Sequence, residues 1–316
     1  MNKIPSESVR LHVYPVLAYL ALTTVLFFPV LVGKTTFLGT WDSSVQTFAW
    51  MTHNFRALQQ GAFALWDFTT FSGTSFVGEL QTAPFYPLTI AFALFSTVGE
   101  PLFVDLFILL HFFLAAVFMH YFLRSFGISP AGCVLGAVVF AFSGPVAARA
   151  PGQPNLHAGL IFLPLVLYTA HSALKAERLR RFLKWTLASG LGLGLMILAG
   201  HAHSCIHAAL CLALFTILVP AAATGGNSGA GNRRSEDKRS VPYNHEKGKE
   251  DKRSVPWKKK KKGVLWIPWK KSIPWISKAK AAYWKAGFLG GAALVSLCFA
   301  GIQIAPALEY LRLAYK

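Results

Sequence analysis

The chain has 316 residues, of which 54% are hydrophobic and 14% are charged, and its formal net charge is +18. Soluble domains carry about a quarter charged residues, so this composition excludes an ordinary soluble protein. Several apolar stretches reach the roughly 20 residues that cross a hydrocarbon core of about 30 Å. The four cysteines lie inside these stretches without disulfide or zinc spacing. The sequence therefore predicts an all-α, polytopic membrane helix bundle.

Eight apolar runs are candidates for membrane spans. They occur at residues 11–33, 85–98, 101–123, 131–148, 157–173, 182–199, 204–222 and 285–308. The first run is too long for the core of a signal peptide and is not followed by a cleavage site, which favours an anchor. The run at 85–98 is short and has prolines near its start, which is typical of a re-entrant or interfacial helix.

Basic residues decide the expected topology. The connections at 124–127 and 175–184 and the loop at 223–284 are all basic, and the positive-inside rule places them in the cytoplasm. This arrangement requires that the apolar run at 85–98 does not cross the membrane. We therefore predict seven spans in the cytoplasmic (inner) membrane, with a cytoplasmic N-terminus and residues 34–100 as one long outer loop.

Three segments are expected in the chain. Residues 1–222 form an N-terminal transmembrane core, 223–284 a basic and largely disordered cytoplasmic loop, and 285–316 contain a further transmembrane helix. The outer loop begins with an amphipathic helix that lies along the membrane surface and stops at Gly61. The face that this helix is expected to bury comprises Val45, Phe48, Ala49, Thr52, Phe55 and Leu58.

The basic loop holds 17 of the 31 Lys and Arg residues. The heptapeptide EDKRSVP occurs there twice, at 236–242 and 250–256, and tryptophans alternate with lysines in 257–284. Tryptophan favours the bilayer interface and lysine clusters favour anionic head groups, so 257–284 is predicted to contact inner-leaflet lipids. A merely solvated loop is the alternative. Nucleic-acid binding is disfavoured because no folded recognition module accompanies the charge.

Polar side chains gather on the expected outer face. Asp42 follows the first span and could either cap the next helix or perform chemistry. Asp67, Glu79 and Gln81 come later in the same loop, where a plain surface position is the alternative. Asp105 lies near the outer end of the second span, and an ionisable group at membrane depth indicates function unless a neighbour pairs with it.

Two other outer connections add polar groups. Arg149, Asn155 and His157 flank one connection, and His201 begins the other. His203 and His207 follow one turn apart, and imidazoles are ligands for zinc or copper. Because no carboxylate is adjacent, a polar cavity lining is the better interpretation, and no metal site is assigned beyond this weak pair.

The order of these motifs resembles the YfhO-like branch of the GT-C membrane glycosyltransferases. Asp42 with Gln46 four residues on matches the acid and glutamine of that family, and the resemblance continues along most of the chain outside 223–284. The matching segments are GAFALWDF (61–68), LQTAPFYPL (80–88), FAFSG (140–144), NLHAGLIFLPLVL (155–167), LAGH (198–201) and AGIQIAPALEYLRLA (300–314).

The resemblance implies a hexosyltransferase that moves a sugar from a polyprenyl-phosphate donor to an extracytoplasmic acceptor of the cell envelope. It implies that Asp42 is the catalytic carboxylate, with Gln46, Asp67, Glu79, Gln81, Asp105, Arg149, Asn155, His157 and His201 as substrate-binding residues. A divalent cation could assist, although the sequence assigns no ligands to one.

Two departures from the family leave alternatives open. After Gly200-His201 the family reads Pro-Gln, whereas Ala202 and His203 stand here. The family is also more than twice as long, so the resemblance implies that this chain corresponds to its N-terminal half. A non-enzymatic carrier or scaffold, or an inactive fragment, is the alternative function; the absence of a clear internal repeat disfavours a transporter.

Overall fold

A computed structural model describes residues 7–39, 42–219 and 275–314. The described chain is mostly helical, and its order of elements is as follows. The helices are α1 (Glu7–Leu26), α2 (Phe28–Leu31), α3 (Phe48–Gln59), α4 (Pro87–Phe95), α5 (Pro101–Ser125), α6 (Pro130–Ala141), α7 (Gly144–Gly152), α8 (Pro154–Leu160), α9 (Leu163–Leu174), α10 (Leu179–Leu198), α11 (Ala202–Leu218) and α12 (Trp275–Ala314). The shorter elements are a π-helical turn η1 (Asp42–Thr47), a 3-10 turn η2 (Leu80–Thr82) and the hairpin strands β1 (Trp66–Asp67) and β2 (Thr74–Ser75).

The structure confirms a mostly helical bundle whose longest helices are long and apolar enough to span a membrane. Five helical segments of the described residues are long and apolar enough to cross, and α1 and α11 contribute shorter apolar stretches. Helix α5 alone has 25 residues, or about 37 Å at 1.5 Å per residue. Helix α4 has nine residues, too few to cross a hydrocarbon core of about 30 Å. Helix α4 is therefore not one of the helices long enough to cross a membrane, as the sequence predicts.

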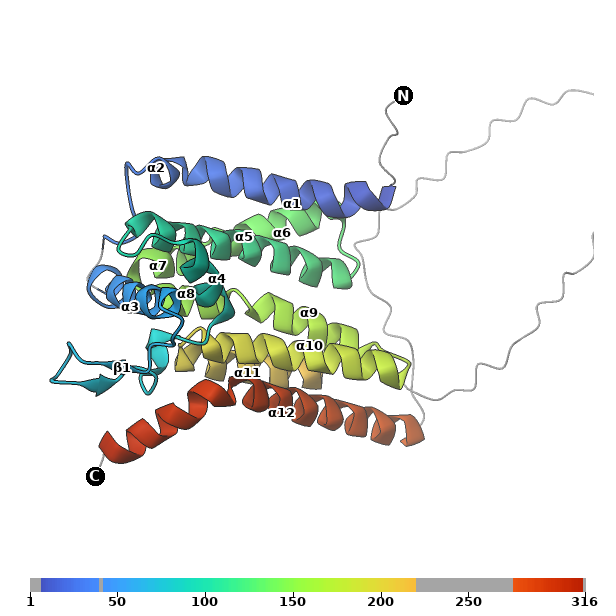
Figure 1. Cartoon of the computed structure of the whole chain (residues 1–316). Coiled ribbons are helices and arrows are strands. Elements are labelled where there is room, and N and C mark those ends of the chain that lie inside the picture. The colour runs from blue at the N-terminus through green and yellow to red at the C-terminus, as the bar shows by residue number, and fades with distance from the viewer. Residues whose placement is uncertain (1–6, 40–41, 220–274, 315–316) are drawn as a thin grey trace, which may run out of the picture.

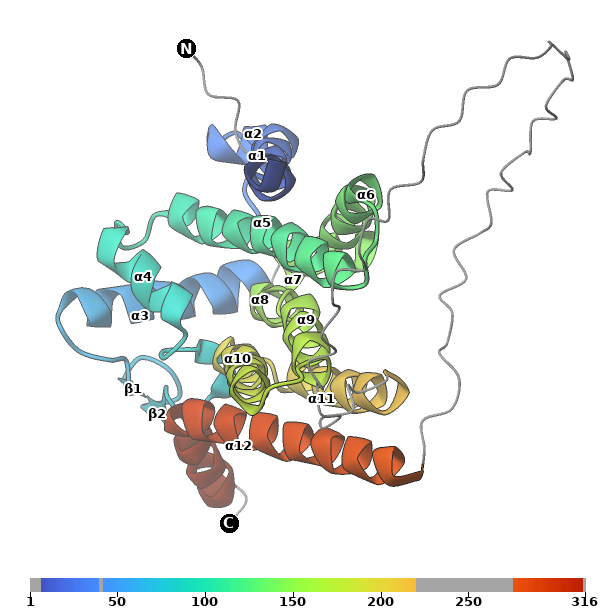
Figure 2. The same ribbon diagram turned by 90° about the vertical axis from the view of Figure 1, so that its right-hand side faces the viewer.

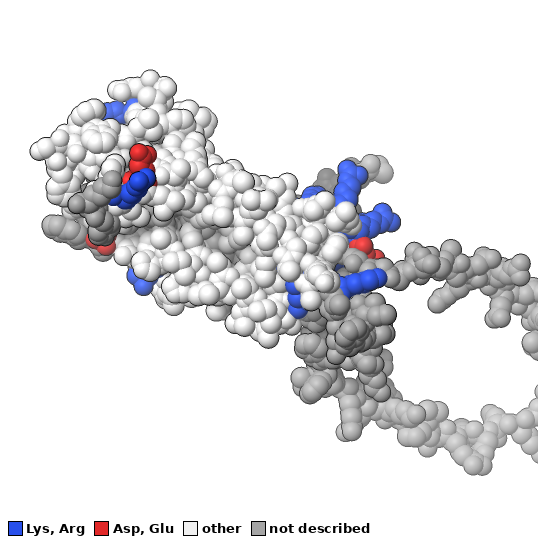
Figure 3. Space-filling model, turned by 90° about the horizontal axis from the view of Figure 1, so that it is seen from below, with Lys and Arg blue, Asp and Glu red and all other residues white. Residues whose placement is uncertain are grey.

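The long helices run side by side, and the short elements gather at one end (Figure 1). Helices α3, α4, α7 and α8 and the hairpin lie at the left end of that view. The start of α1, the α5–α6 and α9–α10 connections and the start of α12 lie at the opposite end. Charged side chains concentrate at the two ends, and the middle of the visible face is uncharged (Figure 3). We call the end with the short elements the loop end.

Glycines let α10 approach two neighbours closely. In the sequence GLGLG, a Cβ on Gly190 would lie 2.6 Å from the Val295 Cβ of α12, and one on Gly192 would lie 3.0 Å from Val166 of α9. Gly194 faces Phe299 of α12 in the same way. Small residues at such spacing allow membrane helices to pack backbone against backbone.

The centre of the bundle lies along α5. Ile108, Phe112, Ala115 and Ala116 are completely buried there, and α5 packs against α1, α6 and α9. Phe112 stacks with Phe142 at a centroid distance of 5.8 Å. Large apolar side chains on the outer helices, in contrast, are exposed and face the position of the lipid.

The buried face of the helix after Asp42 agrees with the prediction in part, because Phe55 is buried and Phe48 and Leu58 pack against the core. Val45 and Ala49 are exposed, whereas Met51 and Asn54 are buried at 5% and 1% exposure. The cause is η1, because a π-helical turn carries more residues than an α-helical turn and shifts the phase of the face. The end of the helix is as expected: α3 ends at Gln59, and Gly61 has φ +76°.

Helix α12 begins at Trp275, ten residues before the predicted span at 285–308. Trp284 packs against Phe182 with a centroid distance of 3.8 Å. The Lys285 ammonium donates to the Ile217 carbonyl at 2.8 Å, which satisfies a carbonyl at the end of α11. The prediction of lipid contact for 257–284 lies mostly outside the described residues.

The arrangement predicts that the hairpin and the α9–α10 connection lie on opposite sides of the membrane. In a cysteine-free background, Phe71→Cys in the hairpin and Glu177→Cys in the connection should react with an impermeant maleimide from opposite sides of sealed vesicles. Both positions are exposed, so access to the reagent decides the result. Labelling of both from the same side would contradict the fold.

Candidate functional site

A small polar pocket surrounds Asp42 at the loop end. Its cavity volume is about 20 Å³, close to the space of a single water. The lining side chains come from η1, η2, α8 and the residues that precede α8 and α11. They are Asp42, Gln46, Thr47, Gln81, Gln153, Asn155, Leu156 and His201. Five of the residues predicted from sequence (Asp42, Gln46, Gln81, Asn155 and His201) therefore meet in one place, although 159 positions separate the first from the last.

Asp42 occupies the first position of η1, and Gln46 lies four residues later in the same turn. Asp42 is half-buried and Gln46 is exposed. Ser43, the buried next residue, donates its hydroxyl to the Phe37 carbonyl at 3.3 Å. This bond ties the turn to the loop that precedes it. Isolated π-helical turns are frequent at functional sites.

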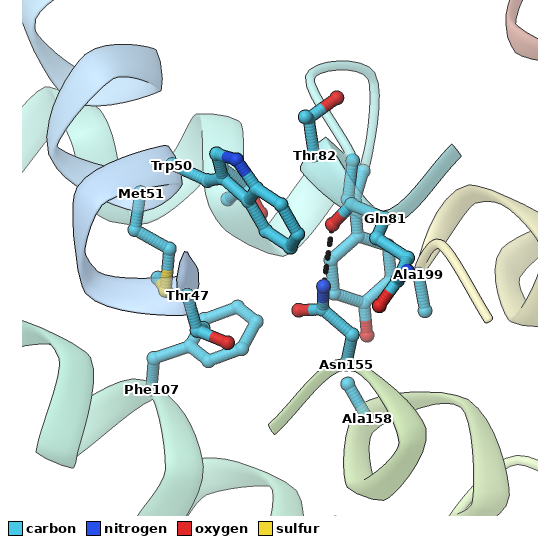
Figure 4. A pocket seen from close by; sticks show the side chains of 12 residues that line it. Thr47, Trp50, Met51, Gln81, Thr82, Phe107, Asn155, Ala158 and Ala199 are labelled. Carbon is cyan, nitrogen blue, oxygen red and sulfur yellow. Dashed lines mark hydrogen bonds between the residues drawn. The ribbon is translucent and has the colours of Figure 1, made fainter. Parts of the chain in front are cut away.

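Three amide side chains hold η2 against the bundle. Gln303 of α12 donates to the Leu80 carbonyl at 2.8 Å, and Asn54 of α3 donates to the Thr82 carbonyl at 2.7 Å. Asn155 of α8 donates to the carbonyl of Gln81, between these two. Figure 4 shows this bond beside the Gln81 side chain. Three consecutive carbonyls thus each have a partner on a different helix, and we call this arrangement the amide clamp.

The backbone at Gly200 completes the clamp. Gly200 has φ +90°, a left-handed conformation that favours glycine. A Cβ at this position would lie 2.6 Å from the Leu80 carbonyl oxygen. The chain therefore reaches His201 while passing directly against η2, which brings Gln81 and His201 into the same pocket.

A second, more apolar pocket lies behind Gln81 and Asn155. Thr47, Gln81 and Asn155 line both pockets. Trp50 and Phe107 lie on the wall of the second pocket in Figure 4. This pocket is about 10 Å³ in volume, so it is filled by side chains and gives the Asp42 pocket a rigid wall.

A larger groove opens from the other side of the Asp42 pocket. Its volume is about 500 Å³, and it shares Gln153, Leu156 and His201 with the pocket. One part of the groove is polar and includes Arg149. The remaining lining is largely apolar; it comprises Pro145, Leu156, Leu160, Leu163, Met196 and Ala208. We call this feature the lipid-facing groove.

Hydrogen bonds orient the polar side chains of this groove. The Arg149 guanidinium donates to the Gln153 side-chain oxygen at 3.1 Å. The Nδ1 of His201 accepts from the Ser204 backbone N–H at 3.4 Å. Burial, followed by the nearby His203 and Arg149, lowers the pKa of His201 below its ordinary value of 6.5. His201 is therefore neutral at pH 7, with its proton on Nε2 as a donor.

Four predicted site residues lie elsewhere and make structural contacts. Asp67 is on the hairpin, where the Thr69 and Thr70 hydroxyls donate to its carboxylate at 2.6 and 2.5 Å. These bonds lower the pKa of Asp67 to about 2. Glu79 accepts from the Gln81 backbone N–H at 3.3 Å and caps η2.

The other two residues are buried. Asp105 accepts from the Phe37 N–H at 2.9 Å and from the Thr36 hydroxyl at 3.1 Å, so it fixes the loop after α2. His157 packs on Phe112 at a centroid distance of 4.5 Å, and its Nδ1 lies 3.2 Å from the Val146 carbonyl. Neither residue lines the Asp42 pocket.

The outer histidines lie near one another: the ring centroids of His201 and His203 are 5.4 Å apart, and His207 lines the same groove. Within the described residues, no group of three His, Cys, Asp or Glu side chains is placed to hold a metal ion. His203 and His207 instead line the lipid-facing groove, and the Nδ1 of His207 lies 2.7 Å from the His203 carbonyl.

Sequence reasoning missed three residues of the site. Gln153 lines both the pocket and the groove, and Asn54 and Gln303 supply two arms of the amide clamp. Gln303 carried a signal, because a lone amide inside an apolar run indicates an interhelical hydrogen bond. Gln153 lies in the same outer connection as Arg149, Asn155 and His157, which are predicted site residues.

The comparisons with known proteins add no relative: no protein-family model, curated protein or solved structure matches the chain.

The amide clamp predicts a specific sensitivity at Gly200. Gly200→Ala should lower the free energy of unfolding by about 1–3 kcal/mol, because a left-handed non-glycine residue is strained and its Cβ would meet the Leu80 carbonyl. Thermal unfolding in detergent measures the loss. Gly287→Ala in α12 is the matched control, since its Cβ would meet nothing within 4 Å. Equal melting temperatures for the two variants would refute the clamp.

Proposed function

We propose that the protein is a GT-C-type membrane glycosyltransferase that takes a sugar from a polyprenyl-phosphate donor. The observation that carries the proposal is the position of Asp42. A half-buried carboxylate, three glutamines and a neutral histidine line a pocket that opens into an amphipathic groove of about 500 Å³. The Asp42 pocket has room for about one water, so in this proposal the reacting sugar lies in the groove, where Gln153, Leu156 and His201 border both features, and the phosphate and the first part of its chain lie farther along the groove.

The orientation in this proposal has seven membrane crossings and a cytoplasmic N-terminus. The α5–α6 and α9–α10 connections lie at the end opposite the Asp42 pocket (Figure 1). These connections and the helix turns that adjoin them carry Arg124, Lys175, Arg178, Arg180 and Arg181. The positive-inside rule places this end in the cytoplasm. Asp42 then faces the extracytoplasmic side.

The chemistry assigns one role to each group. The Asp42 carboxylate accepts the proton of the acceptor hydroxyl while the hydroxyl oxygen forms a bond to the anomeric carbon. The bond from that carbon to the phosphate oxygen breaks, and its electrons leave with the lipid phosphate. Arg149 and the Nε2–H of His201 stabilise the negative charge that develops on the departing lipid phosphate. Electrostatic stabilisation of this kind is usually the largest single contribution to catalysis.

The glutamines orient the sugar. Gln46 and Gln81 carry amides that both donate and accept, which suits sugar hydroxyl groups. The amide clamp fixes the backbone of Gln81, so its side chain is presented without the conformational cost of ordering a free loop. The motif order that resembles the YfhO-like proteins supports the same assignment. A divalent cation is not required by these steps.

The decisive substitution is Asp42→Asn. Asparagine caps a helix about as well as aspartate, so expression and insertion should be preserved, whereas loss of the general base should slow sugar transfer by about 10²- to 10⁴-fold. The assay is transfer from a polyprenyl-phosphate sugar in membranes. Asp67→Asn is the control, since that acid lies on the hairpin away from the pocket. Undiminished transfer by Asp42→Asn would reject the assignment.

The leaving-group role predicts a second loss. Arg149→Gln should reduce transfer by about 10²- to 10³-fold, as removal of a charge-stabilising donor does in other enzymes, and Arg149→Lys should lose less. Lys34→Gln provides a matched control because Lys34 is an exposed cation at the same end that does not line the groove. A Lys34→Gln loss as large as that of Arg149→Gln would indicate a general effect of surface charge.

A further inference from the structure

A second large cavity lies at the loop end, between the hairpin and the last part of α12. Its volume is about 590 Å³. In both ribbon views the hairpin lies beside the C-terminal part of α12 (Figures 1 and 2). Its lining residues are Trp66, Gly73, Thr74, Ser75 and Val77 from the hairpin side, and Pro306, Glu309, Tyr310 and Leu313 from α12. None of these residues lines the Asp42 pocket or the lipid-facing groove.

The aromatic walls of this cavity are held in place. Trp66 pairs with Ser75 across the hairpin, and its ring lies against Gly73, where a Cβ would be 3.0 Å from the indole nitrogen. Trp66 nevertheless stays 47% exposed. On the opposite wall, Tyr310 lies against Gly78, where a Cβ would be 2.6 Å from the tyrosine Cβ. Two glycines thus allow two aromatic side chains to border one opening.

The chemistry of the lining selects the class of ligand. The cavity has two aromatic rings, the Glu309 carboxylate and the hydroxyls of Thr74 and Ser75, and no lysine or arginine lines it. A phosphate or other anion would meet the carboxylate without a cation and is disfavoured. An acyl chain would offer no hydrogen bond to the Glu309 carboxylate or to the Thr74 hydroxyl. A cationic ligand would meet only the solvent-exposed Glu309 carboxylate, and an exposed ion pair contributes little to binding.

A neutral saccharide matches every group. The C–H face of a pyranose ring is apolar and suits an aromatic side chain, which offers a large apolar surface. The hydroxyl groups at its edge donate to a carboxylate and exchange hydrogen bonds with serine and threonine. Pockets that combine apolar walls with a few placed polar groups are the usual form of small-ligand sites.

We propose that this cavity binds a neutral saccharide chain on the extracytoplasmic side. Val77 lines the cavity and Gln81 lines the Asp42 pocket, and four residues of extended chain span at most about 14 Å. This short separation is compatible with one oligosaccharide that lies in the cavity and reaches toward Asp42. Its role as the acceptor of the transferred sugar rests on the proposed function, whereas its binding does not.

The test is direct binding of soluble saccharides to the full-length protein in nanodiscs. Maltohexaose, cellohexaose, mannohexaose and chitohexaose are titrated by calorimetry up to about 10 mM, a range that detects weak sites. At least one should bind, and Trp66→Ala and Glu309→Gln should each weaken it about tenfold, which corresponds to 1.4 kcal/mol. Glu309→Gln keeps the shape of the wall, so it reports on the site even where Trp66→Ala disturbs the hairpin.

Two further variants make the result specific. Phe68→Ala is the matched control, because Phe68 is an 82% exposed aromatic on the same hairpin that does not line the cavity. It should bind saccharide as the wild type does. Lys34→Gln should also bind normally, because Lys34 is exposed and lines neither this cavity nor the Asp42 pocket. No binding by any hexaose, wild-type affinity in both cavity variants, or an equal loss in Phe68→Ala would overturn the proposal.

Discussion

The hydrogen bonds from three helices to η2 are the constraint on which the loop end depends. A carbonyl removed from water needs a donor, because an unpaired buried carbonyl costs about 1–3 kcal/mol; the bond to Thr82 is buried and the bond to Leu80 is partly buried. Here the donors are the amides of Asn54, Asn155 and Gln303, which belong to α3, α8 and α12. One short turn therefore fixes the relative positions of three helices that are far apart in sequence. The same turn presents Gln81 to Asp42 and connects the pocket to the hairpin.

The general architecture could be predicted from the sequence, because apolar length is a strong signal. The runs that become α5, α10 and the later part of α12 are apparent from hydropathy alone. The shortness of 85–98 likewise predicts a helix that does not cross, and α4 is such a helix. The expected topology places Asp42, Gln81, Asn155 and His201 on one face of the membrane, and the order of motifs adds Gln46; the structure places all five around one pocket.

The remaining features depend on contacts between residues far apart in the sequence, which local sequence patterns do not reveal. The bond from Gln303 to Leu80 joins residues 223 positions apart, and the saccharide cavity joins the hairpin to the end of α12. Asp105 shows that a sequence signal for function can belong to a residue with a structural role. An acid at membrane depth suggests function by default, yet its carboxylate accepts from Phe37 and Thr36 and holds a loop in place. Only the three-dimensional partners separate an acid that anchors a loop from one that lines a pocket.

The most direct measurement of the central claim is a cryo-EM structure of the protein in nanodiscs with a non-transferable polyprenyl-phosphate sugar analogue. The account predicts that the phosphate lies between Arg149 and His201, with the lipid chain along the apolar part of the groove and the anomeric carbon facing Asp42. It also predicts that η2 keeps its three amide partners in the complex. A lipid phosphate bound away from this groove, or an Asp42 carboxylate that faces away from the sugar, would contradict the account.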